Sequence, residues 1–151
     1  MKGLILKVDT SLAFVLPLTA SAAEFGDFKV GQSFTLKVIK VTSTQKTGYF
    51  GVETKAPVPG TVPKFKKNAS INFTIGAKGK LMCKGLSIPF AHSNSKQNEY
   101  NFFKEGTVTL NRNAEIDKSA TKKPKSGKLS FFITDYSGAE PEFRTVIYEL
   151  D

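Results

Sequence analysis

Short stretches of apolar residues separated by turn residues run along most of this chain. From residue 31 onward, β-branched and aromatic residues dominate the apolar positions, and no long window has the period of a helix. Turns at Pro57–Gly60 and Gly76–Gly79 separate several of these stretches. The predicted strands are Ser33–Thr42, Tyr49–Thr54, Ser70–Ile75, Lys80–Lys84, Leu86–Phe90, Glu99–Phe103, Thr107–Asn111, Lys128–Thr134 and Phe143–Leu150. This spacing predicts a single all-β domain over residues 31–151, a small barrel or sandwich.

The predicted strand Ser33–Thr42 has an irregular pattern. Phe34, Leu36 and Val38 alternate on one face, whereas Ile39 and Val41 place apolar side chains on the other. A β-bulge, or a long bent strand shared by two sheets, explains this change of face, and a bent first strand suits an OB-like barrel. A central strand buried on both faces is the alternative.

The predicted strand Tyr49–Thr54 alternates regularly, with Phe50 and Val52 on one face and Tyr49 on the other. If Phe50 and Val52 face the core, Tyr49 is exposed beside Gly51 and is able to stack on a nucleobase. The alternative is that Tyr49 packs against a neighbouring strand.

The stretch Lys46–Glu53, with the sequence KTGYFGVE, resembles the glycine- and aromatic-rich strand of cold-shock domains. The segment Phe65–Leu86 has the apolar-turn-apolar shape found late in that domain. The similarity covers less than a third of the chain, the order of glycines and aromatics differs, and the second aromatic motif is missing. The resemblance therefore implies an OB-like barrel and does not assign the chain to the family.

Residues 1–30 have two interpretations, and the first is a secretory signal. Lys2 and Lys7 form its basic region, Leu12–Leu18 its apolar region, and Ala20-Ser21-Ala22 its cleavage site. Asp9 just before the apolar region weakens this interpretation.

The second interpretation is a folded segment. Gly3–Val8 and Ser11–Leu16 form a hairpin, and Thr19 caps a short N-terminal helix, Ala20–Phe25. The single cysteine, Cys83, favours a reducing compartment. We favour the folded segment and a cytoplasmic location; a secreted or periplasmic protein cleaved near Ala22 is the alternative.

Charge is unevenly distributed along the 151 residues, whose net charge is +9. Residues 1–36 are neutral, residues 37–128 carry +13, and residues 129–151 carry −4. A field of this kind attracts polyanions. The cations are almost all lysines, which neutralise phosphate but lack the planar fork with which arginine reads bases.

The candidate nucleic-acid-binding residues are lysines and neighbouring aromatic residues of the basic central segment. Lysines neutralise phosphates, and an aromatic ring between them stacks on a base. The segment Asp117–Lys128 is expected to be a basic loop. The set is Lys37, Lys40, Lys46, Tyr49, Phe50, Lys55, Lys64, Phe65, Lys66, Lys67, Lys78, Lys80, Lys84, Lys118, Lys122, Lys123, Lys125 and Lys128.

Enzymatic chemistry is not expected. His92 lies in a polar stretch without a partner at motif spacing, and Cys83 alternates with Leu81 like a core thiol. With one cysteine and one histidine, no metal site or cofactor is predicted.

The predicted function is non-sequence-specific binding of single-stranded nucleic acid, DNA more than RNA, with homo-oligomerisation left open. One alternative is an exported β-sandwich that binds an anionic glycan or a cell-envelope component. A second alternative is a structural or assembly protein. No apolar stretch reaches the ~20 residues that cross a membrane as a helix.

Overall fold

A computed structural model describes residues 28–93, 97–104, 108–117 and 123–151, with the backbone alone for 91–93 and 97–104. The predicted N-terminal hairpin, the short helix and the alternative signal peptide lie outside the described residues.

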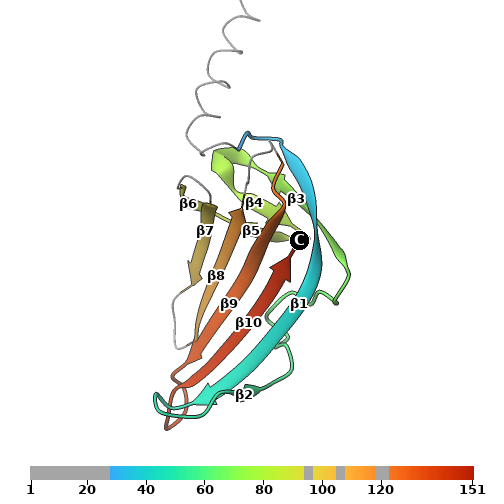
Figure 1. Ribbon diagram of the computed structural model, residues 1–151. Coiled ribbons are helices and arrows are strands. Elements are labelled where there is room, and N and C mark those ends of the chain that lie inside the picture. Colours follow the sequence, from blue (N-terminus) through green and yellow to red (C-terminus); the bar gives the residue numbers. More distant parts are fainter. Residues whose placement is uncertain (1–27, 94–96, 105–107, 118–122) are drawn as a thin grey trace, which may run out of the picture.

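The described chain is almost entirely antiparallel β-structure (Figure 1). Apart from a 3-10 turn at Ala77–Gly79, its regular elements are strands. They are β1 (Ser33–Thr47), β2 (Thr54–Lys55), β3 (Ser70–Ile75), β4 (Leu81–Cys83), β5 (Leu86–Ile88), β6 (Phe90–Ser93), β7 (Gln97–Lys104), β8 (Val108–Asp117), β9 (Ser126–Asp135) and β10 (Glu142–Leu150). The all-β prediction is therefore confirmed.

Two sheets share the long strand β1. Sheet A pairs residues 33–37 of β1 with β3, followed by β4 and β5. Sheet B pairs the rest of β1 with β10, followed by β9, β8, β7 and β6, and β2 pairs with the end of β1. Because β5 returns to contact β7 and β8, the sheet almost closes into a barrel (Figure 1). This up-and-down order differs from the five-stranded Greek key of an OB-fold, so the OB-like form is corrected to a larger meander.

A β-bulge at Ile39 lets β1 serve both sheets. Val38 is paired with Leu150 and Lys40 with Glu149, so Ile39 has no partner in the ladder. The extra residue reverses the alternation, and Val41 instead of Lys40 packs against the core. The irregular apolar pattern of this strand correctly predicted the bend.

The core lies between the two sheets. Along β3 the burial alternates strictly, with Ile71, Phe73 and Ile75 inside. Sheet B contributes inward side chains such as Phe131 and Tyr148, both 0% exposed. Alternating strands of this kind place one polar and one apolar face on each sheet, which explains why short segments suffice to form the fold.

Several predicted strand limits were wrong. β1 extends five residues past Thr42, and the predicted strand Tyr49–Thr54 is a loop that ends in the two residues of β2. β8 continues to Asp117, and His92 lies on β6 instead of in a loop. Threonine, asparagine and serine pair in a sheet when cross-strand neighbours support them, although they look like loop residues in sequence.

Candidate functional site

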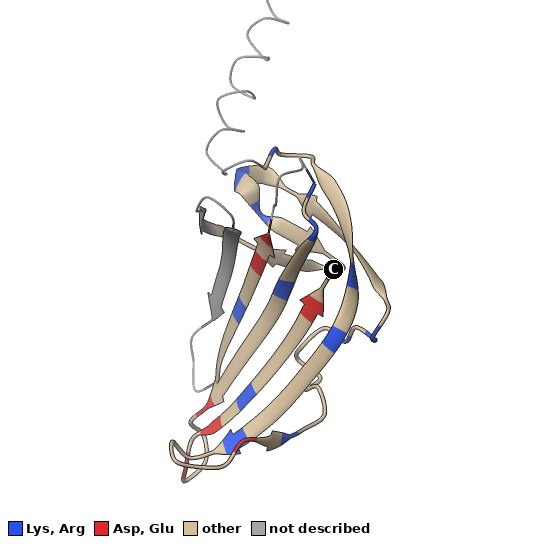
Figure 2. Ribbon diagram, viewed as in Figure 1, with Lys and Arg blue, Asp and Glu red and all other residues tan. Residues whose placement is uncertain are grey.

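The lysines of sheet A form the first candidate surface, which we call the lysine layer. Residues 28–39 and 56–89 contain eight lysines and no aspartate or glutamate. All eight side chains are exposed. They are Lys29, Lys37, Lys64, Lys66, Lys67, Lys78, Lys80 and Lys84. Figure 2 shows these cations around sheet A without an acidic residue on its strands.

Strand β4 places two of these lysines beside an exposed apolar side chain. Leu81 and Cys83 point into the core, and Met82 between them is 44% exposed. Lys80 and Lys84 flank the strand and are exposed, as the alternation predicted. The neighbouring outer positions are polar, and Thr35 Oγ1 donates a hydrogen bond of 2.6 Å to Asn72 Oδ1.

Phe65 is buried and anchors the loop that carries Lys64, Lys66 and Lys67, which we call the lysine loop. Its ring is therefore not exposed for the base stacking that was predicted for it. Its side chain is 6% exposed, and its ring meets the edge of Tyr148 with centroids 5.2 Å apart. The Tyr148 hydroxyl donates a hydrogen bond of 2.7 Å to the carbonyl oxygen of Pro63. Burial raises the pKa of Tyr148, so this hydroxyl keeps its proton. The loop that carries Lys64 and Lys66 is therefore fixed to the core.

Four lysines gather around Phe65. Lys84 Nζ stands 5.7 Å from the centre of the Phe65 ring, a cation–π distance. Lys64 and Lys66 adjoin this ring in sequence and Lys67 follows, all with exposed side chains. The structure thus brings together lysines that the sequence separates by about 20 residues.

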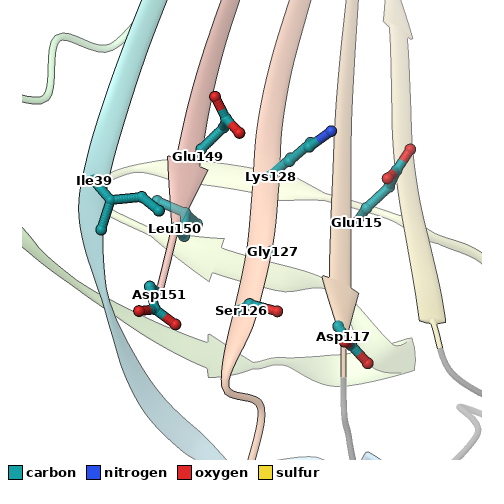
Figure 3. A pocket seen from close by; sticks show the side chains of 9 residues that line it. All are labelled: Ile39, Glu115, Asp117, Ser126, Gly127, Lys128, Glu149, Leu150 and Asp151. Atoms are coloured by element: carbon teal, nitrogen blue, oxygen red, sulfur yellow. The ribbon is translucent and has the colours of Figure 1, made fainter.

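The lysines of sheet B, by contrast, alternate with acids. Cross-strand pairing puts Lys40 opposite Glu149, Glu149 opposite Lys128, and Lys128 opposite Glu115. Lys40 Nζ lies 3.7 Å from Glu149 Oε2. Figure 3 shows Glu149, Lys128 and Glu115 side by side on neighbouring strands. Because their charges are compensated locally, Lys40 and Lys128 contribute little to a basic surface.

A surface hollow of about 500 Å³ lies at one end of this row of charges (Figure 3). Asp117 and Asp151 join Glu115 and Glu149 in its lining, together with Lys128. The hollow is therefore acidic and unsuited to a polyanion. In the described part of the chain, no three His, Cys, Asp or Glu residues converge on a metal site.

Tyr49 and Phe50 lie at the opposite end of sheet B, on the loop after β1. Phe50 is 101% exposed and Val52 is 81% exposed, so neither side chain faces the core. Tyr49 is 62% exposed, and its ring lies against Phe143 with centroids 5.4 Å apart. Tyr136 from the β9–β10 loop is also exposed. We call Tyr49, Phe50, Val52 and Tyr136 the aromatic tip.

Two predicted lysines border the aromatic tip. Lys46 Nζ lies 5.1 Å from the centre of the Phe143 ring and donates a hydrogen bond to the carbonyl oxygen of Tyr49. Lys55 pairs with Thr44 through the backbone. Tyr49, Phe50, Lys46 and Lys55 are therefore grouped, but at a distance from the lysine layer (Figure 1).

The predicted basic loop is only partly described. Lys123 and Lys125 are exposed, and the backbone N–H of Lys125 donates to the carbonyl oxygen of Asp117. Lys118 and Lys122 lie outside the described residues.

Two residues were weighed for catalysis, His92 and Cys83, and only the backbone of His92 is described. The backbone of His92 pairs with that of Glu99. Cys83 is buried, and its burial raises the pKa of the thiol to about 11, against a smaller lowering by Lys84. A thiol that keeps its proton at neutral pH is a poor nucleophile.

No protein-family model, curated protein or solved structure matches this chain. Among the described residues, no helix is long and apolar enough to cross a membrane.

Proposed function

We propose that the protein binds nucleic acid without sequence specificity and holds the phosphate backbone on the lysine layer. The observation that carries the proposal is the presence of eight exposed lysines and no acid in residues 28–39 and 56–89. Nothing in this layer compensates the charge locally, except that Asp151 is paired through its backbone with Lys37. Such a surface releases counterions when it meets a polyanion, and this release drives binding.

Base stacking has a smaller part in the proposal than the sequence suggested. Phe65 is buried, and Tyr49 and Phe50 belong to the aromatic tip on sheet B. The layer also contains no arginine able to read base edges. We therefore expect single strands and duplexes to bind through their phosphates, with little dependence on base composition.

A salt titration with two matched triple variants tests this function. If Lys64, Lys66, Lys67 and Lys84 each neutralise one phosphate, log K falls with log salt with a slope of about −3 for a single strand. Lys64→Gln, Lys66→Gln and Lys67→Gln together should reduce this slope by about 2 and weaken binding to fluorescent oligo-dT at least about tenfold.

The matched control removes the same number of lysines from sheet B, as Lys40→Gln, Lys55→Gln and Lys128→Gln. It has the same net charge as the first triple variant, so a general effect of charge affects both equally. Equal losses in the two variants, or no binding of wild type at low salt, would overturn the proposal.

A second candidate function is the binding of an anionic glycan or envelope polymer by an exported form of the protein. The observation that favours it is that the lysine layer offers charge without an exposed aromatic ring, so it does not distinguish phosphate from sulfate or carboxylate. Two measurements separate the candidates: the N-terminal residue of the native protein, and competition between oligo-dT and a sulfated polysaccharide. A start at Ala23 and preference for the polysaccharide would support the exported form.

A further inference from the structure

The aromatic tip exposes apolar side chains on a rigid support. The backbone N–H of Gly48 donates a 2.7 Å hydrogen bond to the carbonyl oxygen of Pro141, which joins the β1–β2 and β9–β10 loops. Hydrogen bonding to Tyr49 raises the pKa of Tyr136, and this contact links the two loops a second time. Gly48 adopts a φ of +73°, and a side chain at Gly51 would overlap the carbonyl oxygen of Thr47. These contacts therefore hold the backbone that carries Phe50, which needs little ordering on binding.

Carboxylates surround this apolar centre. Residues 47–53 and 135–142 contain Glu53, Asp135, Glu140 and Glu142, and Lys46 and Lys55 border them. Ser137 donates hydrogen bonds of 2.9 Å from its backbone N–H and 2.6 Å from its hydroxyl to Asp135, and these hold the pKa of that carboxyl below its usual value. The Thr44 hydroxyl donates to Glu53. Asp135 and Glu53 are thus oriented by hydrogen bonds.

A cleft of about 710 Å³ opens between these groups. Asp135, Glu140 and Glu142 contribute to its lining, together with Thr47 and small residues of the β9–β10 loop. Its carboxylates suit the ammonium group of a lysine side chain, which offers three donors. A partner for the tip therefore needs lysines next to an apolar contact for Phe50.

The lysine layer of the same protein has this chemistry. Met82 is exposed between Lys80 and Lys84, so an apolar side chain is flanked by two cations. A thioether packs favourably against an aromatic ring. Sheet B offers no comparable surface in its described residues, because its nine cations and nine acids balance.

One molecule is unable to join its own two surfaces. Met82 is paired with Thr74 on β3, and Thr74 is paired with Ser33 at the start of β1. The aromatic tip follows Thr47, at the other end of β1. The 15 residues of β1 separate them, roughly 45–50 Å of extended strand. Figure 1 shows the two regions at opposite ends of the molecule.

We propose that the chain associates head to tail, with the aromatic tip of one copy docked on Met82, Lys80 and Lys84 of the next. Phe50 contacts Met82, and Glu140 and Glu142 receive the two lysines. Because the two contact surfaces differ, a docked pair still has one free surface of each kind, and the product is an open chain or a ring. This association does not rest on nucleic-acid binding, although a polyanion would compete for the same lysines.

Sedimentation velocity of the full chain tests the association, at concentrations up to about 0.5 mM. We expect oligomers at about 50 mM salt and a loss of association at about 500 mM, where exposed charges are screened. Phe50→Ser should weaken association at least about tenfold, because it removes the apolar contact. Phe132→Ser is the matched control: Phe132 is an exposed aromatic residue of sheet B outside both surfaces, and this substitution should leave association unchanged.

A charge-exchange experiment identifies the partner surfaces. The variant Glu140→Lys with Glu142→Lys and the variant Lys80→Glu with Lys84→Glu should each be monomeric, since like charges then meet. Mixing the two variants should restore oligomers, because each tip again meets a layer of opposite charge. Monomeric wild type at low salt, unchanged association of Phe50→Ser, or a mixture that stays monomeric would overturn the proposal. Oligo-dT titration of Phe50→Ser, which retains every lysine, tests nucleic-acid binding separately.

Discussion

Sheets A and B carry different charge although one strand runs through both. Residues 28–39 and 56–89, which build sheet A, have eight lysines and no acids. The described residues of sheet B have nine cations and nine acids. The net charge of the described chain therefore belongs to sheet A alone. The comparison teaches that a basic segment becomes a basic surface only where no acidic strand pairs with it.

The position of β10 explains this difference. It contains Glu142 and Glu149 and lies between β1 and β9 in sheet B. Its Glu149 thereby faces a lysine on each neighbour, Lys40 and Lys128, whereas Glu142 is paired with Thr47 and Asp135. Sheet A receives no such strand, because its β3, β4 and β5 come from an acid-free part of the sequence.

The largest expected effect distinguishes two phenylalanines, one below the lysine layer and one at the tip. Phe65→Ala should lower the free energy of unfolding by about 3–5 kcal/mol, because it leaves a cavity against Tyr148. Phe50→Ala is the matched control and should change it by less than about 0.5 kcal/mol, since its ring is in solvent. Urea unfolding of both variants measures the difference. Similar losses would mean that Phe65 is not the anchor of the lysine loop.

The next effect concerns the thiol beneath the lysine layer. Folding raises the pKa of Cys83 from 9.0 to about 11. Above pH 9 the unfolded chain loses this proton and the folded chain keeps it, so stability falls as the pH rises from 9 towards 11. The full loss is about 3 kcal/mol, from about 1.4 kcal/mol per pKa unit.

Urea unfolding between about pH 8 and pH 11, a range that includes the two pKa values, measures this slope. Cys83→Ala is expected to flatten it, whereas wild type and the control Val108→Ala, at an exposed residue that does not titrate, should share the same decline. An identical slope in Cys83→Ala would show that other groups, such as Tyr148, dominate the alkaline loss.

The smallest expected effect concerns the row of charges on sheet B. Lys40 and Glu149 are 68% and 35% exposed, so solvent screens their attraction. A double-mutant cycle with Lys40→Gln and Glu149→Gln should give a coupling of about 0.2–1 kcal/mol that decreases with salt. A larger, salt-independent coupling would mean that this pair is part of the core of sheet B and does more than compensate charge.

The alternation of apolar residues and the positions of turn residues predicted most strands. Particular segments show where this pattern was sufficient and where it was not. The segment Ser70–Ile75 was predicted with its observed limits, since its apolar residues alternate without interruption. The change of face at Ile39 was compatible with a bulge or with a strand buried on both faces, and the structure has the bulge. Tyr49 and Phe50 were predicted as binding residues, but their segment was predicted as a strand because Phe50 and Val52 alternate, whereas Gly48 and Gly51 in fact close a tight turn.

By itself, the sequence determined the all-β class, the inward and outward faces of strands such as β3 and β4, and the acid-free lysine content of sheet A. These properties depend on neighbouring residues, because a strand has a period of two. Tertiary structure alone decided that Phe65 is an anchor, that Lys84 joins its loop, and that β10 neutralises Lys40 and Lys128. Such contacts join residues far apart in the chain, and their pairing follows from strand order, which local patterns do not contain.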